Sequence, residues 1–505
     1  MNVAELARDS INKFGQYDAF QFGDRHWSNI EHDAYASRLA TVLRDHGVKV
    51  GDRVPVVMSN CPEVLTCFQA IWKIGAVIAP TTPQLGVREL AYVFEHSDAK
   101  IVITQPALAD KISEAADLAP LCKQVYTIGS CEQEGVTDLA PEIESADAFP
   151  DIVSCQPDDM AFLLYTSGTT GHPKGVMLSH NNIISNHLAV AEFKRLKERS
   201  QTILMLPLSH SFGVLMMNLC SIFGAPAAIM SSFDPVEVLR LIQKYKVTRF
   251  SMVPTMLVRL CNTPEREEFD TSCLEIVNSG GAILPNEVRV QFEELFDCKV
   301  LDGYGLSETA PTATSYPSSE RIRPGSIGKP IPGVTVTILD ESGAEVPRNT
   351  PGEICIDGPN IMTGYWKNPE ATKEALRGDV LHSGDIGYMD DDGYLFLTDR
   401  MKDLIIKGGE NISPREIEDG FYNHPAVEEV TVVGIPDSTY GENIVAVMSL
   451  KAGHSPTKAE LLEHVAQHIT KFKIPKQIQF RDELPRNPNG KIDRKRIRAE
   501  LSEGT

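Results

Sequence analysis

The first four hundred residues alternate short apolar runs, rich in β-branched side chains, with amphipathic stretches of helical length. The run "RVPVVMS" (53–59) precedes "CPEVLTCFQAIWKIG" (61–75), and "AKIVITQ" (99–105) precedes "ALADKISEAADLA" (107–119). A later helical pattern, "PVEVLRLIQKYK" (235–246), again leads into an apolar run. Strands that alternate with helices in this way build βα units with mostly parallel sheets. We therefore expect an α/β fold in this part of the chain.

The pattern changes twice further along. Short strands separated by turns, as in "TVTILDESGAEV" (335–346) and "GYLFLTD" (393–399), predict a smaller β-rich subdomain. Beyond "DRMKD" (399–403), helix and strand patterns fill about a hundred residues, which is enough for an α+β domain that folds alone. Because 505 residues exceed a single hydrophobic core, at least two domains are expected. The predicted domains are 1–401 and 402–505, joined by a short hinge.

The distribution of charge excludes some partners. Residues 1–401 contain 33 basic and 53 acidic residues, so nucleic acid is a poor partner for most of the chain. Residues 471–498, in contrast, contain ten Lys or Arg against three acidic residues. These form either a solvated basic face or a surface that attracts a polyphosphate ligand. Residues 130–158 are polar and acidic without periodicity, which predicts a surface connection.

Targeting and cysteine patterns give few further signals. There is no run of 18 or more apolar residues and no basic segment followed by an apolar block at the N-terminus, so we expect no membrane span and a cytoplasmic protein. The ten cysteines form no CxxC pair and no histidines cluster near them in the sequence, which argues against a disulfide framework and against a zinc site. The sequence does not indicate an oligomeric state.

Residues 165–175, "YTSGTTGHPKG", combine four Ser or Thr hydroxyls, three glycines and a lysine. Glycines allow successive backbone N–H groups to converge on an anion, and Lys174 adds a positive charge. The spacing is not that of a P-loop, and such a stretch is often only a linker or a turn. The apolar run before it and the helix that Ser179 could cap after it favour a phosphate loop. Its expected ligand-binding residues are Thr166, Ser167, Gly168, Thr169, Thr170, Gly171 and Lys174.

This loop resembles the signature loop of the adenylate-forming superfamily, which comprises acyl-CoA synthetases, luciferases and peptide-synthetase adenylation domains. Further motifs of the family follow in the same order over nearly the whole chain, with fatty acyl-CoA ligases the most similar. The resemblance implies a mobile C-terminal domain and two reactions. A carboxylic acid, ATP and Mg²⁺ give an acyl-adenylate and pyrophosphate, and coenzyme A then takes the acyl group and releases AMP. The motifs are "NSGGAILP" (278–285), "DGYGLSET" (302–309), "PGEICIDG" (351–358), "HSGDIG" (382–387), "DRMKDLIIKGGENISPREIE" (399–418) and "PRNPNGKID" (485–493).

The resemblance also implies the contacts of ATP. Glu308 corresponds to the family's magnesium ligand, and a carboxylate suits this hard cation. Thr309 is expected to donate to the α-phosphate. Tyr304 is expected to stack on adenine beside Gly303, while Asp302 accepts a hydrogen bond from the adenine amino group.

The same motifs imply the ribose and acyl contacts. Asp385 is expected to accept hydrogen bonds from both ribose hydroxyls, and Arg400 to make a second ribose contact. His210, in "PLSHSFG", corresponds to a position beside the acyl pocket, although a histidine in an apolar run can equally be a satisfied core residue. The wall between adenine and acyl group is expected to consist of Ser279, Gly280, Gly281 and Ala282, whose small size admits ligand.

Lys491, in "NPNGKID", corresponds to the catalytic lysine that bridges the substrate carboxylate and the phosphates of ATP. Without the resemblance, a lysine after Asn-Gly is more commonly an ordinary turn residue. Because it belongs to the predicted C-terminal domain, closure of that domain must assemble the site. Lys402 corresponds to the hinge, and Gly408 and Gly409 to the segment that approaches the acyl group during thioester formation.

The identity of the acid rests on weaker signals. The Phe-Asp pair of "SFDPVEVLRLI" (232–242) and the stretch "KGGENISPREIE" (407–418) resemble those of fatty acyl-CoA ligases, which favours a medium- or long-chain fatty acid. "GEICIDG" (352–358) is nearer to coumarate ligases, and its Cys355 is expected in the core. No large insertion precedes the hinge, which favours coenzyme A over a carrier protein. An aryl-acid CoA ligase, an acyl-AMP ligase that loads a carrier protein and a catalytically silent nucleotide-binding protein remain alternatives.

Overall fold

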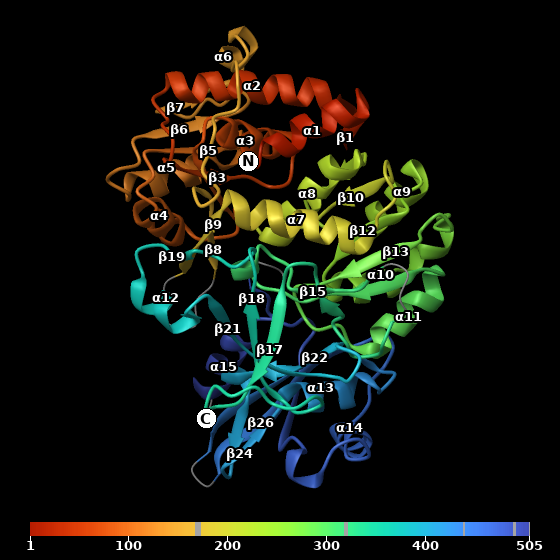
Figure 1. Cartoon of the computed structure of the whole chain (residues 1–505). Helices are drawn as coiled ribbons and strands as arrows, with labels where there is room; N and C mark the ends of the chain where they lie inside the picture. Colours follow the sequence, from red (N-terminus) through yellow and green to blue (C-terminus); the bar gives the residue numbers. More distant parts are fainter. Residues whose placement is uncertain (167–172, 318–321, 438–439, 488–490, 504–505) are drawn as a thin grey trace.

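The structure is a computed structural model that describes residues 1–166, 173–317, 322–437, 440–487 and 491–503. Figure 1 shows a large N-terminal part, coloured red to cyan, above a smaller C-terminal domain in blue. Helices and strands alternate through the large part, so the predicted α/β class with a separate C-terminal α+β domain is confirmed.

A mixed eight-stranded sheet, in the order β19-β9-β8-β4-β3-β5-β6-β7, forms the first subdomain. The six strands from β8 to β7 in this order run parallel, as the βα rhythm predicts, whereas β9 and then β19 extend one edge of the sheet by antiparallel pairing. The strands are β3 (Arg53–Val57), β4 (Val77–Thr81), β5 (Ile101–Thr104), β6 (Gln124–Thr127), β7 (Val136–Asp138), β8 (Met160–Thr166), β9 (Lys174–Ser179) and β19 (Gly364–Tyr365).

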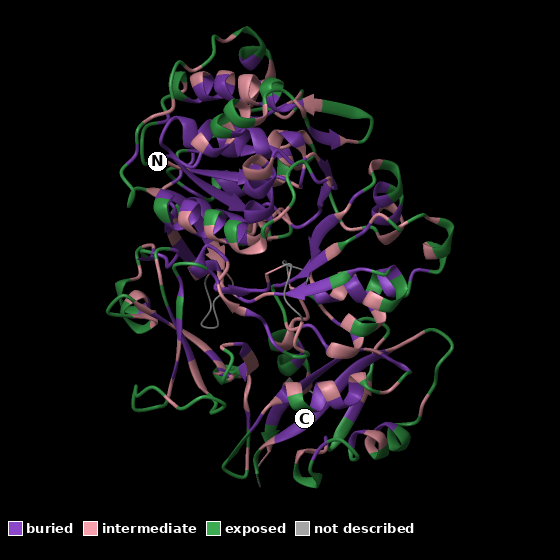
Figure 2. Cartoon of the chain, turned by 45° about the vertical axis from the view of Figure 1, so that its right-hand side comes forward, coloured by how far each residue is buried: buried purple, intermediate pink, exposed green. Residues whose placement is uncertain are grey.

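Helices cover both faces of this sheet because alternate residues of each strand are apolar on opposite sides. Val56 of β3 packs in one cluster with Phe68 and Trp72 of α3 (Pro62–Lys73). Val57, on the other side of β3, packs with Phe94 of α4 (Val87–His96) and with α5 (Ala109–Asp117). Figure 2 shows these strands in the buried colour.

Two further sheets follow. One has the order β10-β11-β1-β2, and the other is the parallel set β12-β13-β14. Their strands are β1 (Asp18–Phe22), β2 (Arg25–Ser28), β10 (Thr202–Leu204), β11 (Ala227–Ile229), β12 (Arg249–Met252), β13 (Ile276–Ser279) and β14 (Lys299–Asp302). The surrounding helices are α1 (Glu5–Phe14), α2 (Asn29–Asp45), α7 (His180–Lys194), α8 (Ser211–Phe223), α9 (Pro235–Tyr245), α10 (Pro254–Cys261) and α11 (Asn286–Phe296).

The predicted small β-rich subdomain is a five-stranded antiparallel sheet with α12 (Pro369–Ala375) beside it. It contains β17 (Thr335–Leu339), β18 (Gly352–Asp357), β20 (Leu376–Arg377), β21 (Val380–Met389) and β22 (Leu395–Arg400). The C-terminal domain has its own five-stranded sheet and its own hydrophobic core. It contains β23 (Ile405–Lys407), β24 (Glu410–Ile412), β25 (Val427–Asp437), β26 (Gly441–Leu450) and β27 (Gln477–Phe480), with α13 (Pro414–Tyr422), α14 (Lys458–Val465) and α15 (Arg494–Glu503).

Two local expectations have different outcomes. Ser179 caps α7 as predicted, because its hydroxyl accepts a hydrogen bond from the backbone N–H of Asn182. Residues 130–158 are not a bare connection, since they contain β7 and α6 (Ala140–Ser145). The sequence shows no apolar periodicity here because α6 is short and contacts the core through Ile143, with Leu139 just before it. Within the described part of the chain, no helix is long and apolar enough to cross a membrane.

Candidate active site

Asp385 and Arg400, the two expected ribose contacts, are joined in the structure. They are cross-strand partners on β21 and β22, and Arg400 Nε lies 3.0 Å from Asp385 Oδ1. The hydroxyl of Tyr304 donates to the other oxygen of Asp385 at 2.7 Å. Asp385 is only 2 % exposed, and burial raises its pKa although Arg400 and Tyr304 oppose the shift. Three residues from separate motifs thus form one network.

Glu353 of β18 supports the turn that leads to Asp385. Its Oε1 accepts a hydrogen bond from the backbone N–H of Gly384 at 3.1 Å. Gly384 has a φ of +70°, which glycine adopts without strain, and the pairing of β18 with β21 is irregular after Glu353. The Asp385 backbone N–H donates to Ser383 Oγ, so the turn is fixed on both sides. No pattern in the sequence indicated this role of Glu353.

Glu308, the expected magnesium ligand, lies in the short helix η3 (Ser307–Thr309). The hydroxyl of Tyr365 donates to Glu308 Oε1 at 2.8 Å, and Lys174 Nζ lies 4.8 Å from the centre of the Tyr365 ring. Tyr365 therefore connects the lysine of the phosphate loop to the carboxylate, and the sequence did not predict it. A half-buried carboxylate with one oxygen not bonded by Tyr365 fits Mg²⁺, which takes one or two protein carboxylates and completes its shell with phosphates and water.

Thr309 and Asp302 are both buried, as Asp385 is. The Thr309 side chain is fully buried, and its hydroxyl lies 2.6 Å from the carbonyl oxygen of Pro311, so the structure directs it into the loop. Asp302 is 8 % exposed at the end of β14 and accepts from the N–H of Gly303. Burial raises the pKa of Asp302 to about 7.

Lys491 extends from the C-terminal domain to the wall residues of the large part. A Cβ built on Gly281 would lie 3.7 Å from Lys491 Cε and 3.9 Å from its Nζ, which are van der Waals distances, so the end of the Lys491 side chain lies beside Gly281. Val253 lies on the same side, at 3.6 Å from that position, while Phe212 lies 3.1 Å from a Cβ built on Gly280. Burial, with a smaller effect of Arg400, lowers the pKa of Lys491 to about 8.

His210 has a structural contact and also lies near Lys491. Its Nδ1 accepts from the backbone N–H of Phe212 and caps α8, which is a structural role. It also lies close enough to Lys491 for that ammonium to contribute, after burial, to a pKa of about 3. The His210 ring is therefore neutral at physiological pH, and it forms part of the surroundings of Lys491.

The remaining predicted residues fall into four groups. Thr166 ends β8, while Ser167, Gly168, Thr169, Thr170 and Gly171 lie outside the described residues. Ser279 ends β13, and Ala282 is exposed beside Gly281. Lys402 is exposed in η4 (Met401–Asp403) between the two domains. Gly408 and Gly409 form the turn between β23 and β24, at the end of the C-terminal domain remote from the large part (Figure 1), so the structure does not bring them to the site.

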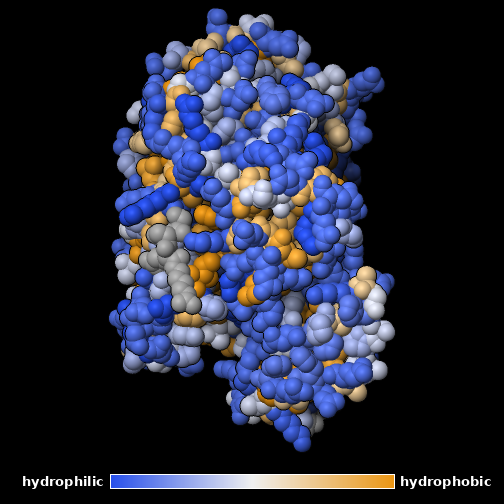
Figure 3. Space-filling model, turned by 90° about the vertical axis from the view of Figure 1, so that its right-hand side faces the viewer, coloured by the Kyte–Doolittle hydropathy of each residue, from blue (hydrophilic) through white to orange (hydrophobic). Residues whose placement is uncertain are grey.

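Apolar side chains gather beside this region. Figure 3 shows a cluster of them at mid-height on one face of the molecule, above the C-terminal domain. Phe212, Val253 and Leu306 pack against the large hydrophobic core, and their apolar side chains are partly exposed. An acid whose carboxylate meets Lys491 would therefore place its remaining part among apolar neighbours.

Comparisons with known proteins show the family of this chain. Residues 7–366 match the AMP-binding enzyme family, and residues 416–491 match the AMP-binding enzyme C-terminal domain. The chain is 34 % identical to the long-chain-fatty-acid–CoA ligase of Bacillus subtilis over 99 % of its own length and 95 % of the relative. It resembles the ATP-bound crystal structure of MatB from Rhodopseudomonas palustris with a TM-score of 0.90 and 32 % identity, covering 100 % and 99 % of the two chains. It resembles the anthranilate CoA ligase AuaEII in complex with anthranoyl-AMP with a TM-score of 0.94 and 25 % identity, covering 100 % and 98 %.

Proposed function

This chain belongs to the AMP-binding enzyme family and is an AMP-forming acyl-CoA synthetase, and from that premise we propose that its acid is a medium- or long-chain fatty acid. The observation that carries the proposal is the position of Lys491. Its ammonium lies beside Gly281, and the Val253 side chain lies on the same side. The ammonium would therefore contact the carboxylate of the acid, and apolar side chains would contact the hydrocarbon part of the acid. The similarity to a long-chain-fatty-acid–CoA ligase supports the same choice.

In the first reaction a carboxylate oxygen of the acid bonds to the α-phosphorus of ATP, and the bond from that phosphorus to the β-phosphate oxygen breaks. We propose that Lys491 stabilises the negative charge that develops between the acid and the α-phosphate. A cation positioned in advance lowers the free energy needed to bring two anions together. Asp385 and Arg400 hold the ribose, and Tyr304 lies beside them for adenine. Bound to Glu308, Mg²⁺ supplies further charge neutralisation.

In the second reaction the sulfur of coenzyme A bonds to the acyl carbon, the carbon–oxygen bond to AMP breaks, and the thiol proton passes to solvent. Lys491 lies beside Gly281 in this structure, whereas Gly408 and Gly409 lie at the remote end of the C-terminal domain. We therefore infer that the domain turns about Lys402 between the two reactions. This rotation would withdraw Lys491 and bring Gly408 and Gly409 to the acyl group.

An aryl acid is the second candidate, because the anthranilate CoA ligase has the higher TM-score of the two structures. A panel of acids separates the two proposals. The enzyme is incubated with ATP, Mg²⁺, coenzyme A and either C6–C16 fatty acids, benzoate or cinnamate, and each thioester is quantified by mass spectrometry. A fatty acid with the highest kcat/KM supports the proposal, and a preference of tenfold or more for an aryl acid overturns it.

A further inference from the structure

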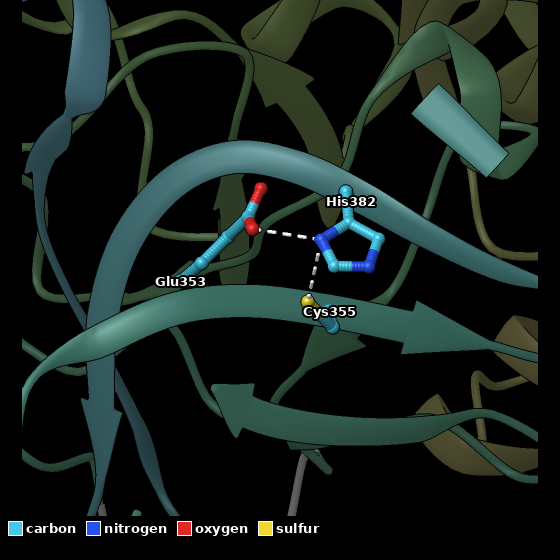
Figure 4. Close-up of side chains that lie close together, drawn as sticks. All are labelled: Glu353, Cys355 and His382. Atoms are coloured by element: carbon cyan, nitrogen blue, oxygen red, sulfur yellow. Dashed lines mark hydrogen bonds and ion pairs between the residues drawn. The ribbon is translucent and has the colours of Figure 1, made fainter. Parts of the chain in front are cut away.

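Three metal-binding side chains meet in the small β-rich subdomain, outside the expected magnesium site. Cys355 of β18 and His382 of β21 are cross-strand partners, and Glu353 precedes Cys355 by two residues on β18. Figure 4 shows the three side chains pointing toward one another from the two strands. His382 Nδ1 lies 2.7 Å from Glu353 Oε2 and 3.5 Å from Cys355 Sγ, and one ligand atom from each residue lies within 4.8 Å of the other two.

The three donors are the thiolate, imidazole and carboxylate that Zn²⁺ binds in proteins. Zinc–sulfur and zinc–nitrogen bonds at a tetrahedral angle separate the two donor atoms by about 3.5 Å. The observed distance between Cys355 Sγ and His382 Nδ1 already has this value. Zinc–nitrogen and zinc–oxygen bonds at the same angle separate their donor atoms by about 3.4 Å. The carboxylate, now 2.7 Å from His382 Nδ1, must therefore move by roughly 0.7 Å to become a metal ligand. Three protein ligands leave the fourth position to water.

The cluster of Glu353, Cys355 and His382 is mostly buried but remains accessible to solvent. The Cys355 residue is 1 % exposed, whereas the side chains of His382 and Glu353 are 10 % and 18 % exposed. Burial and the neighbouring Glu353 raise the pKa of the Cys355 thiol to about 12, so without a metal the sulfur stays protonated. On binding, the thiol loses one proton to solvent, and the hydrogen of His382 shifts from Nδ1 to Nε2.

Glu353 links this cluster to the ATP site. Its Oε2 faces His382, while its Oε1 accepts from the N–H of Gly384, the residue before Asp385. A metal that draws the carboxylate toward Cys355 weakens the contact with Gly384. The turn that directs Asp385 toward Tyr304 and Arg400 then loses a support.

We propose that Glu353, Cys355 and His382 form a site for a thiophilic divalent cation such as Zn²⁺, and that its occupancy inhibits adenylate formation. The part of this proposal that concerns cation binding depends only on the three side chains. The inhibition half rests on the proposed role of Asp385 in holding ATP.

Binding is tested on the full chain with Co²⁺, which reports both thiolate ligation and tetrahedral geometry in its absorption spectrum. We expect one equivalent of Co²⁺ to give a thiolate-to-metal charge-transfer band that Zn²⁺ abolishes. Cys355→Ser should lose this band and His382→Gln should weaken Co²⁺ binding at least tenfold. Cys131→Ser, which changes a partly exposed cysteine elsewhere, should retain both. A band that persists in Cys355→Ser, or no band in the unchanged protein at millimolar Co²⁺, overturns the site.

Inhibition is measured separately, as pyrophosphate release in excess Mg²⁺ with increasing Zn²⁺. The Zn²⁺ concentration for half inhibition should rise at least tenfold in Cys355→Ser and should not change in Cys131→Ser. Equal inhibition of both variants overturns the coupling, whatever the cobalt spectra show. Circular dichroism melting of each variant checks folding, and His382→Gln replaces Cys355→Ser in both experiments if the latter does not fold.

Discussion

The hydroxyl of Tyr365 donates a 2.8 Å hydrogen bond to Glu308, and the ammonium of Lys174 lies 4.8 Å from the centre of the same aromatic ring. One side chain of β19 thus touches both the lysine that follows the phosphate loop and the expected metal ligand. Burial and Glu308 raise the pKa of the Tyr365 hydroxyl, so it remains a donor at every working pH. The contact keeps one carboxylate oxygen engaged and leaves the other for a cation.

Replacing Tyr365 by Phe removes this hydrogen bond and keeps the ring beneath Lys174. We expect the Mg²⁺ concentration for half-maximal adenylation to rise by roughly tenfold, because a hydrogen bond to a charged group is worth about 1.5–3 kcal/mol. The kcat at saturating Mg²⁺ should change little. The measurement is pyrophosphate release against Mg²⁺ at fixed ATP. Tyr388→Phe is the matched control, and an unchanged Mg²⁺ requirement in Tyr365→Phe contradicts the predicted link.

Asp385→Asn tests the ribose contact. The neutral amide keeps the shape of the side chain but leaves Arg400 without its charge partner and makes a weaker acceptor for Tyr304, so we expect the KM for ATP to rise at least tenfold. The sharper measurement compares ATP with 3′-deoxyATP. The unchanged enzyme should lose affinity when the hydroxyl is removed, whereas Asp385→Asn should show little further loss. An equal loss in both proteins would exclude a hydrogen bond from that hydroxyl to Asp385.

Lys491 predicts a dependence of adenylation on pH. Its folded-state pKa is lowered to about 8 by burial and by Arg400, so the ammonium is complete below this pH and is lost as pH rises through about 8. We expect kcat/KM for ATP in pyrophosphate release to fall above pH 8, because this parameter reports the free enzyme. Arginine keeps its proton at this pH, so Lys491→Arg should lower the rate but move the fall to higher pH.

The control for this profile is Lys495→Arg, which changes an exposed lysine of the same terminal segment. It should keep the fall near pH 8. The assignment fails if Lys491→Arg also keeps the fall at the same pH, since another group would then control it.

Local signals in the sequence predicted local structure well. Ser179 could be recognised as a helix cap because the cap and its partner are three residues apart, and the βα rhythm predicted the parallel sheet because strand and helix periods differ. The motifs indicated which residues belong to the candidate site. What they could not show is how far a residue is buried: the hydroxyl of Thr309, which is expected to donate to the α-phosphate, lies 2.6 Å from the carbonyl oxygen of Pro311 in this structure.

Contacts between distant residues depend on strand register, which no short pattern encodes. Cys355 and His382 are 27 positions apart and meet because β18 and β21 pair in one particular register. Tyr365 meets Glu308 from 57 positions away for a similar reason, since β19 pairs with β9 at the edge of the large sheet. Cysteine spacing reports neighbours in sequence alone, so it could not indicate a three-residue cluster built across two strands.

Asp302 predicts how the stability of the ligand-free protein depends on pH. Burial raises its folded-state pKa to about 7 from an ordinary value of 3.8. The folded protein therefore binds a proton that the unfolded chain has released over this range, and the free energy of unfolding should fall as pH rises from about 4 to about 7. The fall due to this one group has an upper limit of about 4 kcal/mol, because each pKa unit corresponds to about 1.4 kcal/mol.

Asp302→Asn removes this titration while keeping the size of the side chain. Urea unfolding at pH 5 and pH 8 gives the free energy for each protein, and the variant should lose less stability than the unchanged protein between these two values. Asp340→Asn, at an exposed turn, is the matched control, because hydrogen bonds from Ser342 and Ala344 lower the pKa of Asp340 and it stays ionised at both pH values. If Asp302→Asn and the unchanged protein lose equal stability from pH 5 to pH 8, Asp302 is already ionised at pH 5. Its carboxylate would then be charged before ATP arrives.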